Sequence, residues 1–151
     1  MKIALLAGTQ SGCGKTTVML ALLQYLKAQK QNISSFKAGP DFLDPLWHQL
    51  ITERTCYNLD TRMVGLEQSQ QLINKQYPQT DLALIEGVMG LFDGRTGVGL
   101  DGSSADLAKG LNCPVILVVD AKGMSGSIVP LVSGYCDYAQ KMGVTISGII
   151  A

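Results

Sequence analysis

The chain has 151 residues, 46% of them hydrophobic and 16% charged, and its twelve Lys and Arg are balanced by twelve Asp and Glu. A chain of this length is typical of one folded domain. The balanced charge provides no positive field for a nucleic-acid backbone or an anionic membrane, and no apolar run approaches the ~20 residues that a membrane span requires. The first apolar stretch is interrupted too early for a signal peptide. We therefore expect a cytoplasmic domain that binds neither nucleic acid nor a membrane.

Short apolar segments rich in β-branched residues alternate with longer segments of helical periodicity. We predict strands at residues 2–7, 32–37, 82–86, 114–120 and 144–150, and helices at 15–29, 45–51, 66–76, 103–111 and 125–141. Gly143 is a stop signal for the last helix. The alternation predicts an α/β fold with a mostly parallel sheet and flanking helices. Because no linker or internal repeat divides the chain, we expect one domain over residues 1–151.

The first predicted strand leads into a glycine-rich loop and then directly into a helix, which is the context of a phosphate-binding P-loop. Gly12 and Gly14 allow successive backbone N–H groups to point at phosphate oxygens. Lys15 supplies a positive charge to the β and γ phosphates, and Thr16 offers a hydroxyl to Mg²⁺. The first glycine of the usual G-x-x-x-x-G-K-[ST] spacing is replaced by Thr9. The sequence thus predicts a P-loop NTPase that binds ATP and Mg²⁺ through Thr9, Gln10, Ser11, Gly12, Cys13, Gly14, Lys15, Thr16 and Thr17.

Charged residues lie at the end of the second predicted strand and just after it. Lys37, Asp41 and Asp44 are expected beside the P-loop, because the carboxyl ends of parallel strands meet at one edge of a sheet and ligands bind there. We predict that all three take part in catalysis and that Asp44 also binds the metal. The alternative for Asp44 is a plain N-cap of the helix that Pro45 opens, and the two roles can coexist. His48, the only histidine, is expected on this helix in a surface or packing role.

Glu86 ends the third predicted strand and is expected at the same edge of the sheet. We predict that it binds Mg²⁺ together with Thr16 and Asp44. An ordinary strand-end carboxylate is the alternative. Phosphoryl transfer needs such carboxylates in addition to the P-loop, and the complete set of predicted catalytic residues is Lys15, Lys37, Asp41, Asp44 and Glu86.

A polar, glycine-rich stretch spans residues 92–104. It is predicted to be a mobile loop that closes over the substrate. The alternative is a solvated connection in which Ser103 or Ser104 caps the next helix.

Residues 144–151 end inside an apolar strand pattern, without a polar tail or a covering helix. We interpret the chain as part of a longer polypeptide, with a P-loop domain that is incomplete at its C-terminus. The four cysteines lie far apart, without the spacing of a zinc site. They are predicted to be reduced, structural thiols: Cys13, Cys56, Cys113 and Cys136.

Several segments resemble one family, the cobyrinic acid a,c-diamide synthases with their hydrogenobyrinic acid and nickel-sirohydrochlorin relatives. The resemblance covers nearly the whole chain. It rests on GTQSGCGKTT (8–17), FKAGPDFLDP (36–45), NLD (58–60), EGVMGLFDG (86–94) and VVDAKGMS (118–125).

The resemblance implies ATP-dependent amidation of the a and c side-chain carboxylates of a corrin-type ring in cobalamin biosynthesis, through an acyl phosphate and with ammonia from glutamine. It implies a corrinoid polycarboxylate substrate and a fold similar to that of dethiobiotin synthase. By the same resemblance, Lys15 and Thr16 hold ATP and Mg²⁺, while Asp41, Asp44 and Glu86 bind metal and steer phosphorylation. The family pattern includes a downstream glutaminase domain that these residues do not contain. That domain is an expected partner within the full-length polypeptide, and a homodimer is left open.

Two alternatives stay open at this point. One is a carboxylate-activating ligase like dethiobiotin synthase, which the segments at 39–41 and 86–94 fit less well. The other is an ATPase switch of the partitioning type, which typically has a lysine four or five residues before Lys15, where this chain has Gln10 and Ser11.

Overall fold

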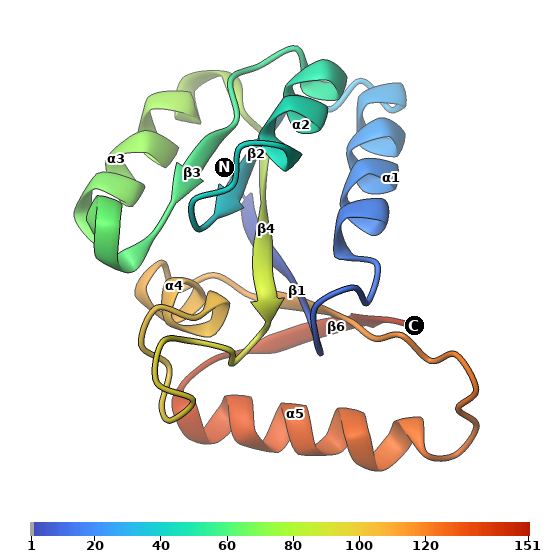
Figure 1. Cartoon of the computed structure of the whole chain (residues 1–151). Helices are drawn as coiled ribbons and strands as arrows, with labels where there is room; N and C mark the ends of the chain where they lie inside the picture. The colour runs from blue at the N-terminus through green and yellow to red at the C-terminus, as the bar shows by residue number, and fades with distance from the viewer. Residues whose placement is uncertain (1) are drawn as a thin grey trace.

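Six parallel strands in the order β3-β2-β4-β1-β5-β6 form the centre of the protein (Figure 1). The computed structural model describes residues 2–151. The strands are β1 (Lys2–Gly8), β2 (Ile33–Ala38), β3 (Tyr57–Leu59), β4 (Leu82–Gly90), β5 (Val115–Val118) and β6 (Ile146–Ile150). The predicted α/β class with a parallel sheet is confirmed.

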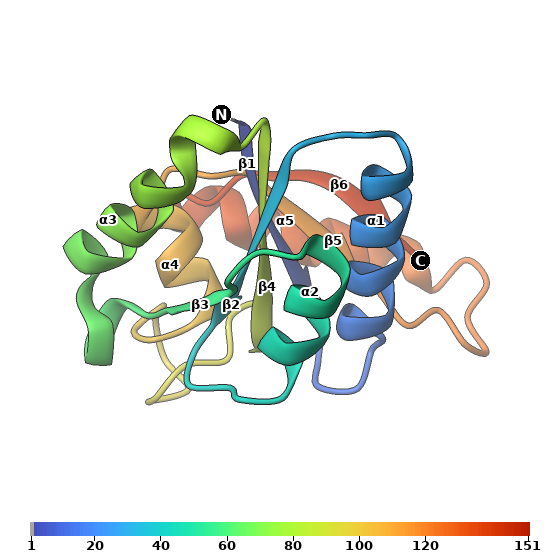
Figure 2. The same ribbon diagram turned by 90° about the horizontal axis from the view of Figure 1, so that it is seen from above.

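Helices connect the strands and lie on both faces of the sheet (Figure 2). They are α1 (Lys15–Ala28), α2 (Asp44–Thr52), α3 (Leu66–Gln76), α4 (Ser104–Gly110) and α5 (Ile128–Met142), with short helical turns η1 (Thr61–Gly65) and η2 (Tyr77–Gln79). Gly143 ends α5 with a φ of 75°, as its position predicts. Helix α5 begins later than expected because residues 121–127 form turns. Along residues 2–151, no helix combines the length and hydrophobicity that a membrane span requires.

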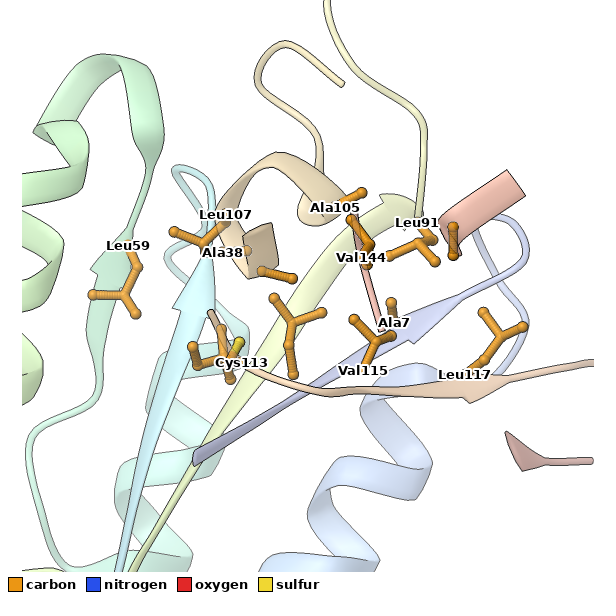
Figure 3. Close-up of a cluster of buried hydrophobic side chains, with 14 of the residues drawn as sticks. Ala7, Ala38, Leu59, Leu91, Ala105, Leu107, Cys113, Val115, Leu117 and Val144 are labelled. Atoms are coloured by element: carbon orange, nitrogen blue, oxygen red, sulfur yellow. The ribbon is translucent and has the colours of Figure 1, made fainter. Parts of the chain in front are cut away.

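The strands divide their side chains between two hydrophobic clusters, because successive residues of a strand point to opposite faces. Leu6 and Leu84 pack with Met19 and Leu23 of α1 on one face. The other face is covered by α3, α4 and α5, and it buries the larger cluster shown in Figure 3. That cluster includes Ala7, Ala38, Leu59, Leu91, Ala105, Leu107, Cys113, Val115, Leu117 and Val144.

Strand β3 is the one strand that the sequence pattern did not predict. It has three residues, too few to show an alternating pattern, and it pairs with β2 at the edge of the sheet. Its central residue, Asn58, donates hydrogen bonds from Nδ2 to the carbonyl oxygens of Gly39 at 2.7 Å and Asp41 at 2.8 Å. The short strand therefore fixes the loop that follows β2, and with it the position of Asp41.

All four cysteines are free thiols, as their spacing predicts. Cys13, Cys56 and Cys113 are buried, whereas Cys136 is partly exposed. Burial raises the pKa of Cys56 to about 12 and that of Cys113 to about 11, so both sulfurs stay protonated at neutral pH.

Candidate functional site

The loop between β1 and α1 has the backbone conformation of a phosphate cradle. Gly12 and Gly14 have φ values of 77° and 94°, in the left-handed region that glycine adopts without strain. No atom lies within 4 Å of a Cβ built at either position, so conformation and not space requires glycine there. Gly14 caps α1 without a side chain, which leaves no cap to compete with a phosphate for the first N–H groups of the helix. The buried Lys15 donates from Nζ to the carbonyl of Gln10 at 3.1 Å.

Three of the predicted loop residues shape the cradle without lining the cleft above it. The side chain of Cys13 is buried, and a Cβ added to Gly8 would lie 2.3 Å from its sulfur, so glycine allows this contact. The carbonyl of Thr9 accepts a hydrogen bond from the hydroxyl of Tyr135 at 2.5 Å. Gln10 is the third loop residue that does not line the cleft. The predicted loop residues that do line the cleft are Ser11, Gly12, Gly14, Lys15, Thr16 and Thr17.

Strand register brings the charged residues to the loop. Lys37 of β2 lies opposite Glu86 of β4, and both point to the sheet face that α1 and α2 cover, because their neighbours Phe36 and Ile85 belong to the cluster on the other face. Lys37 Nζ lies 2.7 Å from Asp44 Oδ2 and 3.2 Å from Glu86 Oε1. The structure therefore joins residues from two separate predicted segments.

Two further contacts complete this cluster. Thr16, in the first turn of α1, donates its hydroxyl to Glu86 Oε1 at 2.6 Å and lies 3.5 Å from Asp44 Oδ2. Asp41 Oδ2 lies 3.7 Å from Lys37 Nζ, and 32% of the Asp41 side chain is exposed. Asp44 is the first residue of α2 and not its N-cap. The N-cap is Leu43, and no side-chain hydrogen bond caps the helix there. The alternative capping role for Asp44 is therefore wrong.

The ion pairs keep both buried partners charged. Burial by itself would lower the pKa of Lys37, but the hydrogen bond to Asp44 and the charges of Glu86 and Asp44 outweigh burial and raise it above its ordinary value. Burial would likewise raise the pKa of Glu86, but hydrogen bonds from His48 and Thr16 and the charge of Lys37 lower it. At neutral pH the floor of the site thus carries fixed positive and negative charges.

These residues surround an open cleft of about 460 Å³. Within residues 2–151, no group of three or more His, Cys, Asp or Glu is arranged as a metal site made by the protein alone. The oxygen donors of Thr16, Asp44 and Glu86 nevertheless fit Mg²⁺, since this ion prefers oxygen and takes only one or two carboxylates when nucleotide phosphates supply the other ligands. All five predicted catalytic residues line this one cleft: Lys15, Lys37, Asp41, Asp44 and Glu86.

The two serines at the start of α4 have different contacts. Ser103 caps the helix, because its hydroxyl accepts from the N–H of Asp106 at 3.1 Å. Ser104 instead accepts from the N–H of Val88 at 2.9 Å and donates to its carbonyl at 3.1 Å. Since Val88 lines the cleft, Ser104 ties α4 to the wall of the site. Closure of residues 92–104 over a substrate stays a prediction.

His48 contacts a residue of the site, although no motif in the sequence marked it. Its side chain is fully buried, with Nε2 2.7 Å from Glu86 Oε2 and Nδ1 3.4 Å from the sulfur of Cys56. The surface role considered from the sequence is therefore wrong. The signal that could have found it is helical spacing: His48 follows Asp44 by four residues, and residues at i and i+4 share one helix face.

Residues 4–151 match the family described as the CobQ/CobB/MinD/ParA nucleotide binding domain. The chain belongs to this family. The match extends over the P-loop, the strands that carry Lys37 and Glu86, and the last strand. Nucleotide binding, which the glycine-rich loop predicts, is thus a property of the family.

Within this nucleotide-binding family, the chain is similar to several proteins named cobyrinate a,c-diamide synthase. It is 42% identical to that of Syntrophotalea carbinolica over 146 residues, which are 97% of this chain and 31% of the relative. The Synechocystis sp. protein is 43% identical over 148 residues, 97% of this chain and 30% of the relative. The Salmonella typhimurium protein is 47% identical over 134 residues, 87% of this chain and 28% of the relative. The predicted resemblance is confirmed, and the chain spans about a third of the length of these relatives.

Proposed function

We propose that this domain is the ATP-dependent synthetase part of a cytoplasmic cobyrinate a,c-diamide synthase. The reaction would convert the a and c side-chain carboxylates of cobyrinic acid, or of hydrogenobyrinic acid, into amides during cobalamin biosynthesis. The names of the relatives support the corrinoid substrate, and the family supports a bound nucleotide, which we take to be ATP. A glutaminase domain elsewhere in the same polypeptide would release the ammonia from glutamine.

The observation that carries the proposal is the fixed lysine and carboxylate cluster beside the P-loop. A substrate carboxylate is already ionised at pH 7, because its reference pKa is about 4. Its activation therefore requires positioning and charge neutralisation and no general base. Lys37 is held by Asp44 at 2.7 Å and by Glu86 at 3.2 Å, and it lines the cleft together with Lys15. Two fixed ammonium groups in one cleft suit a reaction between two anions.

The chemistry proceeds in two steps that balance. A carboxylate oxygen of the substrate attacks the γ-phosphorus of ATP, the bond to the β-phosphate oxygen breaks, and ADP leaves. Ammonia then attacks the acyl carbon, the bond from that carbon to the phosphate oxygen breaks, and the proton lost from nitrogen leaves with the phosphate as hydrogen phosphate. Lys15 and the N–H groups of the loop bind the phosphates, while Lys37 neutralises the anions that meet in the cleft.

Thr16, Asp44 and Glu86 would hold Mg²⁺. When bound, the ion neutralises phosphate charge and fixes the orientation of the nucleotide. Asp41, at the rim of the cleft, would complete the carboxylates that steer phosphorylation.

Two measurements test the proposal. The first is calorimetric titration of the chain, by itself and within its full-length polypeptide, with ATP in Mg²⁺ and in EDTA. Lys15→Ala should abolish binding, whereas Lys27→Ala, at the far end of the same helix, should leave it unchanged. Lys27 is a suitable control because 40% of its side chain is accessible and its ion pair is with the exposed Glu53.

The second measurement is ADP release from the full-length polypeptide with cobyrinic acid and ammonium chloride, which removes the need for a glutaminase. Hydroxylamine in place of ammonia should trap the acyl phosphate as a corrinoid hydroxamate. ATP hydrolysis that does not depend on the corrinoid, or on any carboxylate substrate, would favour an ATPase switch and reject the proposal. Trapping with a different carboxylate alone would favour a ligase like dethiobiotin synthase.

A further inference from the structure

The two oxygens of Glu86 face different surroundings. Oε1 accepts from Thr16 at 2.6 Å and lies 3.2 Å from Lys37 Nζ, and both partners line the cleft. Oε2 lies 2.7 Å from Nε2 of His48, which is fully buried and does not line the cleft. One oxygen is thus directed toward the ligand side and the other toward the protein interior.

His48 is itself held on its second nitrogen and on its backbone. Nδ1 lies 3.4 Å from the sulfur of Cys56, just before β3. The carbonyl of His48 accepts from the hydroxyl of Thr52 at 2.9 Å. A neutral ring with its hydrogen on Nε2 satisfies every partner, since it donates to Glu86 and accepts from the Cys56 thiol at Nδ1. The imidazole therefore has one orientation in which all of its polar atoms are paired.

We propose that His48 is a positioning residue for Glu86: it binds Oε2 and thereby keeps Oε1 directed at Thr16 and the cleft. The inference rests on the proposed function, in which Glu86 and Thr16 hold Mg²⁺. Carboxylates that bind metals are themselves hydrogen-bonded by neighbouring groups, and loss of such a partner typically weakens metal affinity about 10–100-fold. Without His48, the Glu86 carboxylate loses the one partner that is not shared with the ligand.

The test compares ATP affinity in Mg²⁺ and in EDTA for the full-length polypeptide and three variants. His48→Leu keeps the apolar bulk and removes the hydrogen bond. His48→Gln carries an amide N–H at about the reach of Nε2, whereas His48→Asn carries one at about the reach of Nδ1. Both amides are polar and similar in size, so they form a matched pair if the leucine variant does not fold.

His48→Leu and His48→Asn should weaken ATP binding at least about tenfold in Mg²⁺ and leave it unchanged in EDTA. His48→Gln should recover most of the Mg²⁺-dependent affinity. A merely structural role would give a different result, in which binding falls equally in Mg²⁺ and EDTA or follows the urea midpoint of each variant. That result, or equal affinities for the Gln and Asn variants, would overturn the inference. A wild-type protein whose ATP affinity does not respond to Mg²⁺ would instead reject the proposed Mg²⁺-dependent function, and the inference with it.

Discussion

Replacing Lys37 by Met tests whether the charge cluster stabilises the protein in addition to serving the site. The variant keeps the length and apolar stem of the side chain and removes its ammonium group. Lys37 and Glu86 are almost inaccessible, with 4% and 0% of their side chains exposed. The substitution therefore leaves a buried carboxylate without its cation.

The cost follows from the burial of the pair. Removing one partner of a buried ion pair typically destabilises a protein by about 3–5 kcal/mol. We expect the lower end, about 3 kcal/mol, because Glu86 keeps its hydrogen bonds with Thr16 and His48. With a urea dependence of roughly 2 kcal/mol per M, the unfolding midpoint should fall by about 1.5 M at pH 7.

The loss should depend on pH with a defined sign. In the wild type, burial favours a raised pKa for Glu86, but its hydrogen bonds and Lys37 hold the pKa below the ordinary 4.5. The stability that the charged form contributes is thus present above pH 4.5 and lost as pH falls through the lowered value. In the variant, the charge of Lys37 no longer opposes the effect of burial, so the pKa of Glu86 is higher than in the wild type and Glu86 takes up a proton at higher pH. The difference between the two proteins should be largest at pH 7 and narrow toward pH 4.5.

The assay is urea unfolding without nucleotide or Mg²⁺, followed by circular dichroism. Lys27→Met is the matched control, because it removes the same group from an exposed pair, with 40% of Lys27 and 78% of Glu53 accessible. Its midpoint should not change measurably. A urea midpoint for Lys37→Met that equals or exceeds that of the wild type would refute the reasoning. The desolvation of Lys37 would then destabilise the protein by at least as much as its ion pairs stabilise it.

Three other substitutions or treatments have defined outcomes. Tyr135→Phe removes the hydroxyl that binds the carbonyl of Thr9 and should lower the unfolding free energy by about 1 kcal/mol. ATP binding should also weaken, because the phosphate loop loses this hydrogen bond. An unchanged unfolding free energy and an unchanged ATP affinity would contradict this prediction. Ser103→Ala removes the cap of α4 and should cost about 1 kcal/mol in urea unfolding, whereas Ser103→Asp should retain the stability. The pKa values of Cys56 and Cys113 are raised to about 12 and about 11. Both thiols should therefore resist alkylation by iodoacetamide at pH 8 until urea unfolds the protein. Equal alkylation rates before and after unfolding would show that their burial is not maintained.

The α/β alternation and the P-loop could be predicted because each rests on local physics. Helix α3 begins and ends at the predicted residues. Gly143 ends α5 because the chain there needs a positive φ, which glycine adopts without strain. The sequence also placed the predicted site residues together, since ends of parallel strands meet at one edge; in the structure Lys37 lies near the end of β2, whereas β4 continues beyond Glu86 to Gly90. Lys37 and Glu86 needed no knowledge of strand order to be placed together.

Other features depend on contacts between distant segments. Strand β3 is defined by its pairing with β2 and has no pattern of its own. The role of Cys13 could not be read from its place in the phosphate loop, because the loop turns its side chain into the protein against Gly8. His48 is polar and stands alone in the sequence, and only the fold shows that it faces Glu86.

Strand register determines how Lys37 and Glu86 are arranged at the floor of the cleft. Lys37 and Glu86 are direct neighbours across β2 and β4, and a slip of one residue in either strand would turn its charged side chain to the opposite, apolar face. Glycine at position 87 allows β4 to lie close to Ser104, because a Cβ there would lie 2.8 Å from the Ser104 hydroxyl, which already binds Val88. The buried hydrophobic residues that alternate with Lys37 and Glu86 therefore determine the geometry of the site as directly as the charged residues do.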